Sequence, residues 1–336
     1  MLVLVRIPGV PTLASLLALD LGTANTVICH PSKGIIYDQP TLIAHDKKSG
    51  RIVGIGHDAK DAVGKVSGYV VVERPIREGR IANIEALDSY LEALVRVLSR
   101  KRIARPKVVV GVPPFVSVVE VRSLLTSLRR AGFSDITQVN SVLASAIGLG
   151  ADVNLPTGSM VVNLGAGTTL SGIVAFGEVV VDSHAPCGGM SLDQSLTEFM
   201  RYKCGLYIDE DTSEELKLAL ARLGEDEPKY VSSLWGRDVA KGVPVQIEIR
   251  EEDVREIIVD PIKRIIEVVL NNLANCPAEL AQDLVYDGLH LCGGSSQISG
   301  LAKMIAKASQ VPVHLVDEPR YTLARGLAIY GGYLDK

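Results

Sequence analysis

Two stretches of the chain share one pattern of apolar and polar positions. Residues 16–21 are apolar apart from Asp20, residues 22–25 are small or polar, and a second apolar run follows them. Residues 159–175 repeat this order around the small residues 165–168. A short apolar run, a small polar turn and a further apolar run are typical of a β-hairpin. The sequence therefore predicts two similar hairpins, one near the beginning of the chain and one near its middle.

Further apolar segments follow each hairpin in an alternation of strands and helices. An amphipathic helix is predicted over 84–99, where Leu87 and Leu91 fall on one face. The uninterrupted apolar run 108–112 predicts a strand that is covered on both faces. The other predicted elements are strands at 34–37, 136–139, 179–182, 288–291 and 312–315 and helices at 116–130, 142–150, 192–202, 252–274, 301–308 and 321–330. This alternation favours parallel strands that are joined by right-handed crossovers.

The chain of 336 residues has room for two domains of ordinary size. The predicted halves are residues 1–157 and 158–336, which meet at a Thr-Gly pair. Each half contains a polar insertion, at about 38–74 in the first and about 188–247 in the second. The last helix, 321–331, is expected to pack back on the first half. We therefore predict an α/β fold of two duplicated halves, each with a mixed sheet, flanking helices and a small inserted subdomain.

The turn of the first hairpin, Gly22–Asn25, has the chemistry of an anion site, and we call it the first tip. Gly22 and Ala24 let backbone N–H groups approach an anion closely, and Thr23 and Asn25 add side-chain donors. Asp20, the last residue of the predicted buried strand, can hold a hydrated Mg²⁺ beside that anion. For this tip alone, an ordinary polar hairpin is an equally good interpretation.

The turn of the second hairpin, which we call the second tip, repeats the design with Gly165, Ala166, Gly167 and Thr168. Asn163 takes the place that Asp20 has in the first hairpin. Two such tips in one chain favour a duplicated domain that grips a single polyphosphate from both sides. This hypothesis rests on the repetition, because neither tip alone would support it.

Composition excludes several classes of protein. The net charge of −4 gives no reason to expect a nucleic acid as a partner. The five cysteines are scattered without a metal-ligand spacing, which argues against a zinc or iron–sulfur site and favours reduced thiols in a cytosolic protein. The cysteines are Cys29, Cys187, Cys204, Cys276 and Cys292.

Two segments are candidates for contact with an anionic membrane surface. Residues 1–13 are largely apolar but are too short to span a bilayer, and they lack a clear signal-peptide pattern. A strand or tail added to the first sheet is the alternative for this segment. Residues 100–105 are basic, and each Lys or Arg near an anionic surface contributes about 1 kcal/mol. An ordinary solvated loop is the alternative there.

Taken together, the motifs resemble one family. Residues 20–26 resemble the first phosphate loop of the MreB-type bacterial actins, residues 163–169 are similar to the second phosphate loop, and residues 291–296 to the adenosine loop. The runs 75–82, 158–162 and 276–281 also match that family. The resemblance covers about 16–331 and is specific to MreB rather than to the wider superfamily of actins, DnaK-type chaperones and sugar kinases.

The resemblance implies an actin-like ATPase fold of two ribonuclease-H-like halves with ATP and Mg²⁺ between them. It also implies polymerisation into filaments at the cytoplasmic face of the cell membrane, a role in cell shape, and cell-wall elongation proteins as partners. The cofactor-binding residues that it implies are Asp20, Gly22, Thr23, Ala24, Asn25, Asn163, Gly165, Ala166, Gly167, Thr168, Glu214, Glu215, Leu216, Lys217, Gly293, Gly294, Ser295 and Ser296. Asp20 and Asn163 would hold the Mg²⁺ through water.

Several positions depart from the family pattern. Asn140 stands where the family has the Glu that positions the attacking water, and Asn163 stands where it has Asp. Met190 replaces an Asp after a Gly-Gly pair, and Ser295 replaces the third Gly of the adenosine loop. Lys217 is retained, but the Glu expected two residues later is Ala219.

The departures predict weak catalysis more than weak binding. An amide in place of a carboxylate about 4 Å from a divalent ion removes several kcal/mol of gross attraction at an effective dielectric of roughly 20, although water offsets much of it. Asn140 cannot act as a base and is one methylene shorter than Glu. Loss of general-base help costs roughly 10²–10⁴-fold in rate, and a water misplaced by roughly 1 Å costs about a hundredfold. Hydrolysis is therefore predicted to be slow or absent unless a neighbouring residue takes over.

These observations favour an MreB-like polymer with a weakened ATPase, at most a slow enzyme. The alternatives are a non-polymerising pseudo-ATPase scaffold and a modulator of an active MreB paralogue. A small-molecule kinase of the same superfamily needs a carboxylate to deprotonate its acceptor, and both Asn140 and Asn163 are amides. A DnaK-type chaperone needs a substrate-binding domain after the ATPase, and we expect none here.

Overall fold

The structure is a computed structural model that describes residues 16–62, 69–98, 105–224 and 230–334. The predicted lipid-contact segments 1–13 and 100–105 lie outside these ranges, apart from Arg105. Contacts divide the chain into two compact units. Unit 1 consists of Met1–Asn154 and Arg320–Lys336, and unit 2 of Leu155–Pro319, so the chain enters unit 2 at residue 155 and returns to unit 1 at residue 320.

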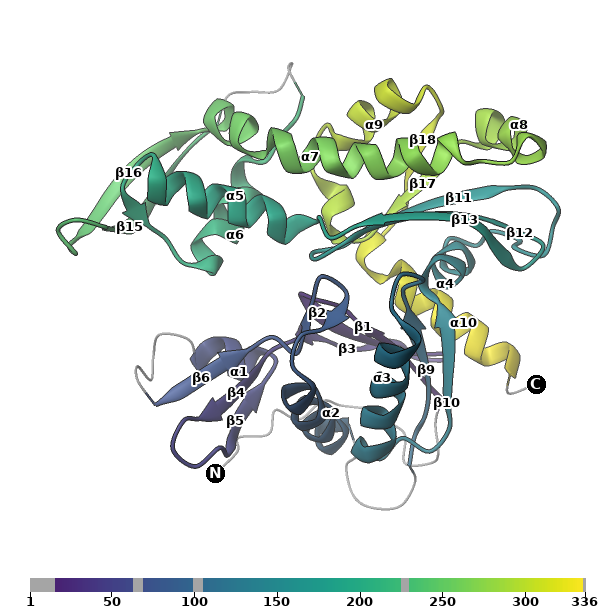
Figure 1. The fold of residues 1–336 in the computed structure, drawn as a ribbon, viewed down its shortest axis with the longest axis horizontal. Helices are drawn as coiled ribbons and strands as arrows, with labels where there is room; N and C mark the ends of the chain where they lie inside the picture. Colours follow the sequence, from purple (N-terminus) through teal and green to yellow (C-terminus); the bar gives the residue numbers. More distant parts are fainter. Residues whose placement is uncertain (1–15, 63–68, 99–104, 225–229, 335–336) are drawn as a thin grey trace. The chain divides into compact units, whose positions relative to one another are not determined.

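Unit 1 is built on a five-stranded mixed sheet in the order β10-β9-β1-β2-β3 (Figure 1). Strands β1, β9 and β10 run parallel, and β1, β2 and β3 run antiparallel. The predicted parallel arrangement therefore holds for β1, β9 and β10, whereas the first hairpin and β3 form the antiparallel part of the sheet. The strands are β1 (Leu16–Leu21), β2 (Asn25–His30), β3 (Gly34–Pro40), β9 (Lys107–Val112) and β10 (Ile136–Asn140).

Helices cover both faces of this sheet, which explains its uninterrupted apolar strands. Leu17 and Leu19 of β1 point into a core with α2 (Ile84–Leu98) and the residues around α3 (Val118–Ala131). Ala18, between them, points into a second core with α4 (Ser141–Gly148) and α10 (Thr322–Leu334). Successive residues of one strand thus serve opposite faces.

Helices α4 and α10 pack closely because small residues meet where they cross. A Cβ atom on Gly326 would overlap the carbonyl oxygen of Ala144, and one on Gly148 would overlap that of Thr322. The two helices come from distant parts of the sequence, and α10 also packs on β1. The last helix of the chain therefore completes unit 1.

A small three-stranded sheet, in the order β5-β4-β6, occupies the polar segment that follows β3. It consists of β4 (Ile43–Asp46), β5 (Ile52–Ile55) and β6 (Val70–Glu73), with α1 (His57–Ala62) beside it. A two-stranded ribbon then follows, β7 (Ile76–Arg77) and β8 (Arg80–Ile81).

Unit 2 repeats the topology of unit 1. Its main sheet has the order β13-β12-β11-β17-β18, in which β11, β17 and β18 are parallel and β11, β12 and β13 are antiparallel. Strand β11 therefore has the place that β1 has in unit 1, and β12 that of β2. The strands are β11 (Ser159–Leu164), β12 (Thr169–Ala175), β13 (Glu178–Ala185), β17 (Leu289–Cys292) and β18 (Val313–Leu315). This repetition confirms the predicted duplication of mixed sheets flanked by helices.

The long helix α7 (Glu251–Ala274) packs on strands β12 and β13 of this sheet, and its Ile262 and Ile265 share the core with Met160. The other helices are α5 (Gly189–Tyr202), α6 (Glu210–Leu220), α8 (Ala278–Asp287) and α9 (Leu301–Ser309), with the short 3₁₀ helices η1 (Gly294–Gln297) and η2 (Pro319–Tyr321). A second small sheet contains β14 (Leu206–Tyr207), β15 (Val231–Asp238) and β16 (Pro244–Arg250). The sequence pattern did not predict α6, α8 or the hairpin of β15 and β16.

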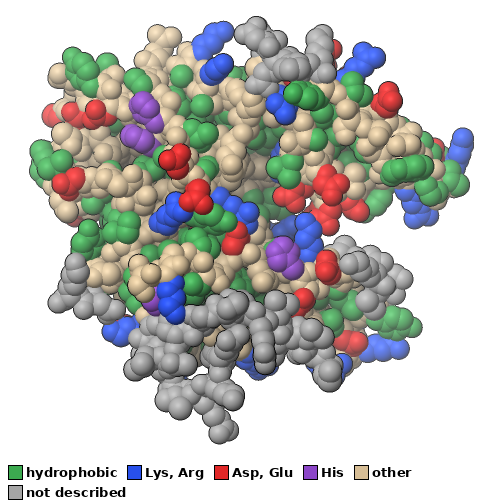
Figure 2. Space-filling model, turned by 180° about the vertical axis from the view of Figure 1, so that it is seen from behind, with side chains coloured by type: hydrophobic (Ala, Val, Ile, Leu, Met, Phe, Trp, Pro, Cys, Tyr) green, Lys and Arg blue, Asp and Glu red, His purple; other side chains and the backbone are tan. Residues whose placement is uncertain are grey.

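The described surface carries charges of both signs. Figure 2 shows acidic and basic side chains interspersed over the visible face, in keeping with the net charge of −4. Among the residues that the structure describes, none of the helices combines the length and the apolar character that crossing a membrane requires.

Candidate functional site

The two tips close in the same way within their separate units. In the first tip, the Gly22 N–H donates to the carbonyl oxygen of Asn25 at 3.1 Å. In the second, the Gly165 N–H donates to the carbonyl oxygen of Thr168 at 2.9 Å. Each turn contains four residues between paired strand ends. The shared hydrogen bond shows that the repeated sequence pattern folds into a repeated local structure.

Asp20 and Asn163 occupy equivalent positions in the two hairpins. Asp20 pairs with Val27 across the first hairpin, and Asn163 pairs with Leu170 across the second. Each lies one residue before the last strand residue that precedes its tip. The structure therefore places the amide in unit 2 where unit 1 has a carboxylate.

The carboxyl group of Asp20 has an unusual electrostatic environment. The pKa of Asp20 is raised from 3.8 to about 7, mainly by burial and secondarily by the negative charge of Asp38. A cation beside the group would offset both effects by favouring its charged form. A hard, oxygen-preferring ion such as Mg²⁺ fits this donor.

Residues from other elements of unit 1 hold the first tip in place. The Thr23 hydroxyl oxygen accepts a hydrogen bond from the Gly79 N–H at 3.1 Å, which leaves its own hydrogen to donate to an anion. The Ala24 carbonyl accepts from the Thr41 N–H at 2.8 Å. Asn25 donates one amide hydrogen to Asp38 at 3.1 Å, so only part of its predicted donor capacity remains for a ligand.

The second tip is held by the start of α5 and by the residues that follow β17. The Gly189 N–H donates to the Gly165 carbonyl at 3.1 Å, and the Met190 N–H donates to the Ala166 carbonyl at 2.8 Å. The Ser295 hydroxyl also donates to the Gly165 carbonyl, at 2.8 Å. Met190 and Ser295, both departures from the family pattern, thus support the tip by hydrogen bonds of their own.

Close packing at two glycines shows how tightly these segments converge. A Cβ atom on Gly188 would lie 2.5 Å from the Gly165 carbonyl oxygen. One on Gly189 would lie 2.7 Å from the Ser295 hydroxyl and 3.4 Å from the Lys217 ammonium. The structure therefore gathers parts of the second tip, of α5, of α6 and of η1 at one place in unit 2.

Lys217 is paired with an acidic residue that the sequence interpretation missed. Its ammonium lies 2.7 Å from a carboxylate oxygen of Asp193 and 3.4 Å from the Gly189 carbonyl, and both side chains are largely buried. Asp193 follows Gly189 by one helical turn, so it shares a helix face with the glycine that lies against the second tip. The four-residue spacing between Gly189 and Asp193 was the sequence signal that could have placed Asp193 near the second tip.

We expect Asp193 to titrate near pH 6. Burial is the largest cause that raises its pKa from 3.8 to about 6, Lys217 opposes this effect, and Glu214 and Glu210 add to it. Replacing Lys217 with Met should therefore raise the pKa further. Because the folded chain binds this proton more tightly than the unfolded chain, the free energy of unfolding should fall as pH rises from 3.8 to about 6.

Carboxylate chemical shifts measured by NMR over a pH series would test this prediction. Asp46 is an internal reference, since hydrogen bonds from Ser49 lower its pKa. An Asp193 midpoint at the ordinary value, or one that Lys217→Met leaves unchanged, would contradict the prediction.

The three residues before Lys217 lie in different environments. Glu214 and Glu215 are exposed on α6, whereas the Leu216 side chain is 3% exposed and lies in the core of unit 2. Its predicted place in the cofactor site can therefore involve only its backbone, because the apolar side chain is used for packing. Ala219, where the family has Glu, is exposed.

The predicted adenosine loop contacts the strand that leads to the second tip. Gly293 has a positive φ of 82°, and a Cβ atom there would overlap the Leu164 carbonyl oxygen and lie 2.5 Å from the Asn163 amide oxygen. Its N–H donates to the Pro319 carbonyl at 2.7 Å, and its carbonyl accepts from the buried Ser296 hydroxyl at 2.7 Å. Gly294, by contrast, has open space around it.

Asn140 uses its amide oxygen to cap a helix. It is the residue before α4, and its Oδ1 accepts a hydrogen bond from the Val142 N–H at 2.8 Å. This bond satisfies one of the unpaired donors at the helix start. The oxygen is therefore already bound to the backbone of α4, and as a neutral amide oxygen it cannot take a proton from a water molecule.

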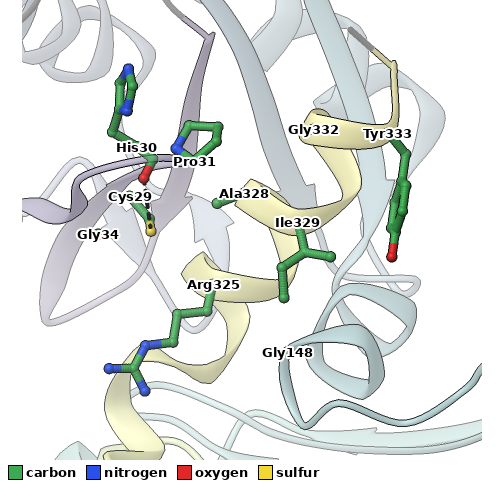
Figure 3. A pocket seen from close by; sticks show the side chains of 10 residues that line it. All are labelled: Cys29, His30, Pro31, Gly34, Gly148, Arg325, Ala328, Ile329, Gly332 and Tyr333. Atoms are coloured by element: carbon green, nitrogen blue, oxygen red, sulfur yellow. Dashed lines mark hydrogen bonds between the residues drawn. The ribbon is translucent and has the colours of Figure 1, made fainter. Parts of the chain in front are cut away.

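A cavity of about 470 Å³ in unit 1 lies apart from the predicted site (Figure 3). It is lined by residues of β2, β3 and the turn between them, of α4 and of α10, among them Cys29, Arg325, Ile329 and Tyr333. None of its lining residues is a predicted cofactor-binding residue. No group of three or more His, Cys, Asp or Glu side chains within the described ranges is arranged to hold a metal ion.

Comparisons with known proteins place this architecture in a family. The family model described as MreB/Mbl protein matches residues 14–336. The chain is 28% identical over 321 residues to the cell shape-determining protein Mbl of Bacillus subtilis, covering 95% of this chain and 96% of that protein. It is 30% identical over 316 residues to the cell shape-determining protein MreB of Escherichia coli, covering 92% and 91%.

The fold also matches solved structures of an MreB protein. The structure of MreB5 of Spiroplasma citri bound to AMPPNP has a TM-score of 0.89 with this chain at 26% identity, covering 97% of this chain and 98% of that one. The same protein bound to ADP has a TM-score of 0.90 at the same identity. Because the family match extends over nearly the whole chain, this protein belongs to the MreB/Mbl family of bacterial actin homologues.

Proposed function

We propose that this chain binds ATP with Mg²⁺ and polymerises into membrane-associated filaments that serve cell shape or intracellular organisation, while hydrolysing ATP slowly or not at all. The observation that carries the proposal is the pair of tips with one closing hydrogen bond each, at Gly22 and at Gly165. A glycine-rich turn of this kind lets backbone N–H groups approach a phosphate closely. The MreB5 structures bound to AMPPNP and to ADP support a nucleotide as the ligand.

Each unit would supply a different part of the nucleotide site. In unit 1, the first tip would contact the phosphate tail, and Asp20 would hold the Mg²⁺ through water. In unit 2, the second tip would contact the phosphates, and Gly293–Ser296 with Lys217 would lie at the nucleoside. The bound Mg²⁺ would neutralise phosphate charge. Asn163 would add a neutral oxygen, so the charge that attracts the ion would come from Asp20.

Weak hydrolysis follows from the role of Asn140, which caps α4 and has no basic atom. A residue that activates water needs a basic atom directed at that water. The Asn140 oxygen instead accepts the Val142 N–H, and its nitrogen cannot act as a base. Nucleotide binding would not depend on Asn140, so the chain would bind ATP without hydrolysing it efficiently.

The setting of the filament is proposed from the family. The relatives named as cell shape-determining proteins support the role in cell shape. From the family resemblance we further propose a location in the cytoplasm, at the inner face of the membrane, with cell-wall elongation proteins as partners. The first partner would be the chain itself, as a homopolymer or as a co-polymer with a paralogue. Residues 1–13 and 100–105 are the proposed membrane contacts. The mild net charge gives nucleic acid no part in this function.

Sedimentation and phosphate release measured together would test the proposal. Purified protein is expected to pellet at high speed with ATP and Mg²⁺, to remain in the supernatant without nucleotide, and to release little phosphate while it pellets. Phosphate release as fast as that of an active MreB would contradict weak hydrolysis. Failure to pellet under any nucleotide condition would contradict polymerisation.

A second candidate is a non-polymerising modulator of an active MreB. The Asn140 cap favours it, because a chain that cannot hydrolyse ATP would slow the turnover of any filament that incorporates it. This candidate predicts that the chain alone does not pellet, but that it co-pellets with an active MreB and slows its phosphate release.

A further inference from the structure

Asp38 of β3 is a meeting point for three polar side chains of unit 1. Its carboxylate accepts a hydrogen bond from the Asn25 amide at 3.1 Å and another from the Tyr321 hydroxyl at 3.0 Å. It also forms an ion pair with the guanidinium of Arg320. The Asp38 side chain is only 18% exposed, so these donors replace most of its water. Hydrogen bonds from charged donors to carboxylates are among the stronger ones in proteins.

The sheet register explains why these groups meet. Asp20 pairs with Val27, and Val27 pairs with Asp38, so the three residues form one row across β1, β2 and β3. Directly paired residues point to the same face of a sheet. Val27 belongs to the core that α10 covers, so Asp38 faces the side from which α10 approaches. Arg320 and Tyr321 immediately precede that helix.

Arg320 and Tyr321 are also the first residues after the chain leaves unit 2. The residue before them, Pro319, accepts the Gly293 N–H within unit 2 at 2.7 Å. Pro319 is thus held within unit 2, whereas Arg320 and Tyr321 are held to Asp38 within unit 1. Asp38 in turn holds Asn25, whose carbonyl closes the first tip.

We propose that Asp38, Arg320 and Tyr321 form a clasp that positions the first tip and so sets the affinity for the phosphate tail of the nucleotide. The three are positioning residues, since they act through Asn25 and not through the nucleotide. This inference rests on the proposed nucleotide binding and names the residues that tune it. With the clasp intact, the first tip is already in its binding geometry before the nucleotide arrives, which removes an ordering cost from binding.

The test compares a triphosphate with a monophosphate. Arg320→Leu and Asp38→Asn are each expected to weaken Mg²⁺-ATP binding about tenfold, measured by calorimetry on the full chain. AMP, measured by competition, should bind as it does to the wild type, because its single phosphate depends less on the first tip. The double variant should lose no more than Asp38→Asn alone, because Arg320 acts on the first tip only through Asp38. Arg320→Lys should restore part of the ATP affinity.

The control variant is Arg130→Leu, which removes an ion pair of 3.1 Å with Asp88 in the same unit and should leave both affinities unchanged. Tyr321→Phe deletes one hydroxyl and gives a smaller, separate test should Arg320→Leu fail to fold. Wild-type ATP affinity in all clasp variants would overturn the clasp, as would an equal loss for ATP and AMP. A wild-type chain that binds neither nucleotide would instead overturn the proposed function, and the clasp with it.

Discussion

Replacing Asn140 with Glu is expected to raise the rate of phosphate release at saturating Mg²⁺-ATP by about a hundredfold. The amide oxygen of Asn140 accepts a hydrogen bond from the Val142 N–H and has no basicity with which to activate a water molecule. A glutamate at this position is one methylene longer and carries a basic carboxylate, so it can reach beyond the helix start towards a water molecule. The measurement is single-turnover phosphate release, which reports the chemical step separately from product dissociation.

The matched control for this change is Asn140→Gln. It has the length of Glu but no basic oxygen, so it should leave phosphate release at the wild-type rate. Both variants lose the short side chain that caps α4, at a cost of about 1 kcal/mol in the free energy of unfolding. An Asn140→Glu chain that releases phosphate no faster than Asn140→Gln would show that the missing base is not what limits hydrolysis.

Replacing Gly293 with Ala should lower the free energy of unfolding by about 2 kcal/mol and weaken ATP binding at least about tenfold. The backbone of Gly293 has a φ of 82°, which an alanine adopts at a cost. Its methyl group would also overlap the Leu164 carbonyl and press on the Asn163 amide. Those atoms belong to the strand that leads to the second tip, so relief of the overlap would move the tip. Urea unfolding followed by circular dichroism and calorimetry with ATP would measure the two effects.

The neighbouring residue provides the control for stability. Gly294 has nothing within contact distance of an added methyl group and no positive φ, so Gly294→Ala should leave the free energy of unfolding unchanged or slightly higher. Equal destabilisation by both substitutions would show that the packing around Gly293 is not the cause.

Sequence patterns predicted the parts of the fold that depend on neighbours along the chain. The helices α2 and α7 fall within a residue or two of their predicted bounds because apolar residues recur at helical spacing, and strand β9 does so because it is one uninterrupted apolar run. The two tips were found for a similar reason, since a hairpin turn is encoded by a few adjacent residues. Strand β16 carries a local signal, the alternation of Val245, Ile247 and Ile249 with polar residues, and it was missed because the whole surrounding segment was interpreted as a polar insertion.

The parts of the site that the sequence did not predict depend on distant residues. Asp38 and Arg320 are 282 residues apart, and the residues adjacent to either one give no indication that the two side chains pair. Asp193 was passed over because its partner Lys217 lies on another helix. The cap made by Asn140 could have been anticipated, since Asn is a favoured residue at a helix start. The resemblance directed attention to the missing Glu instead of to what the Asn does.

The close crossing of α4 and α10 has a consequence for the order in which the protein folds during translation. Residues 322–334 leave the ribosome after all of unit 2, so the apolar face that includes Ala18, Val27 and Val109 lacks one of its two covering helices while residues 155–319 are being made. Unit 2 holds its residues in one continuous stretch and can complete its core first. The nascent first unit would therefore keep a partly exposed apolar sheet face, to which a chaperone could bind, until α10 is synthesised.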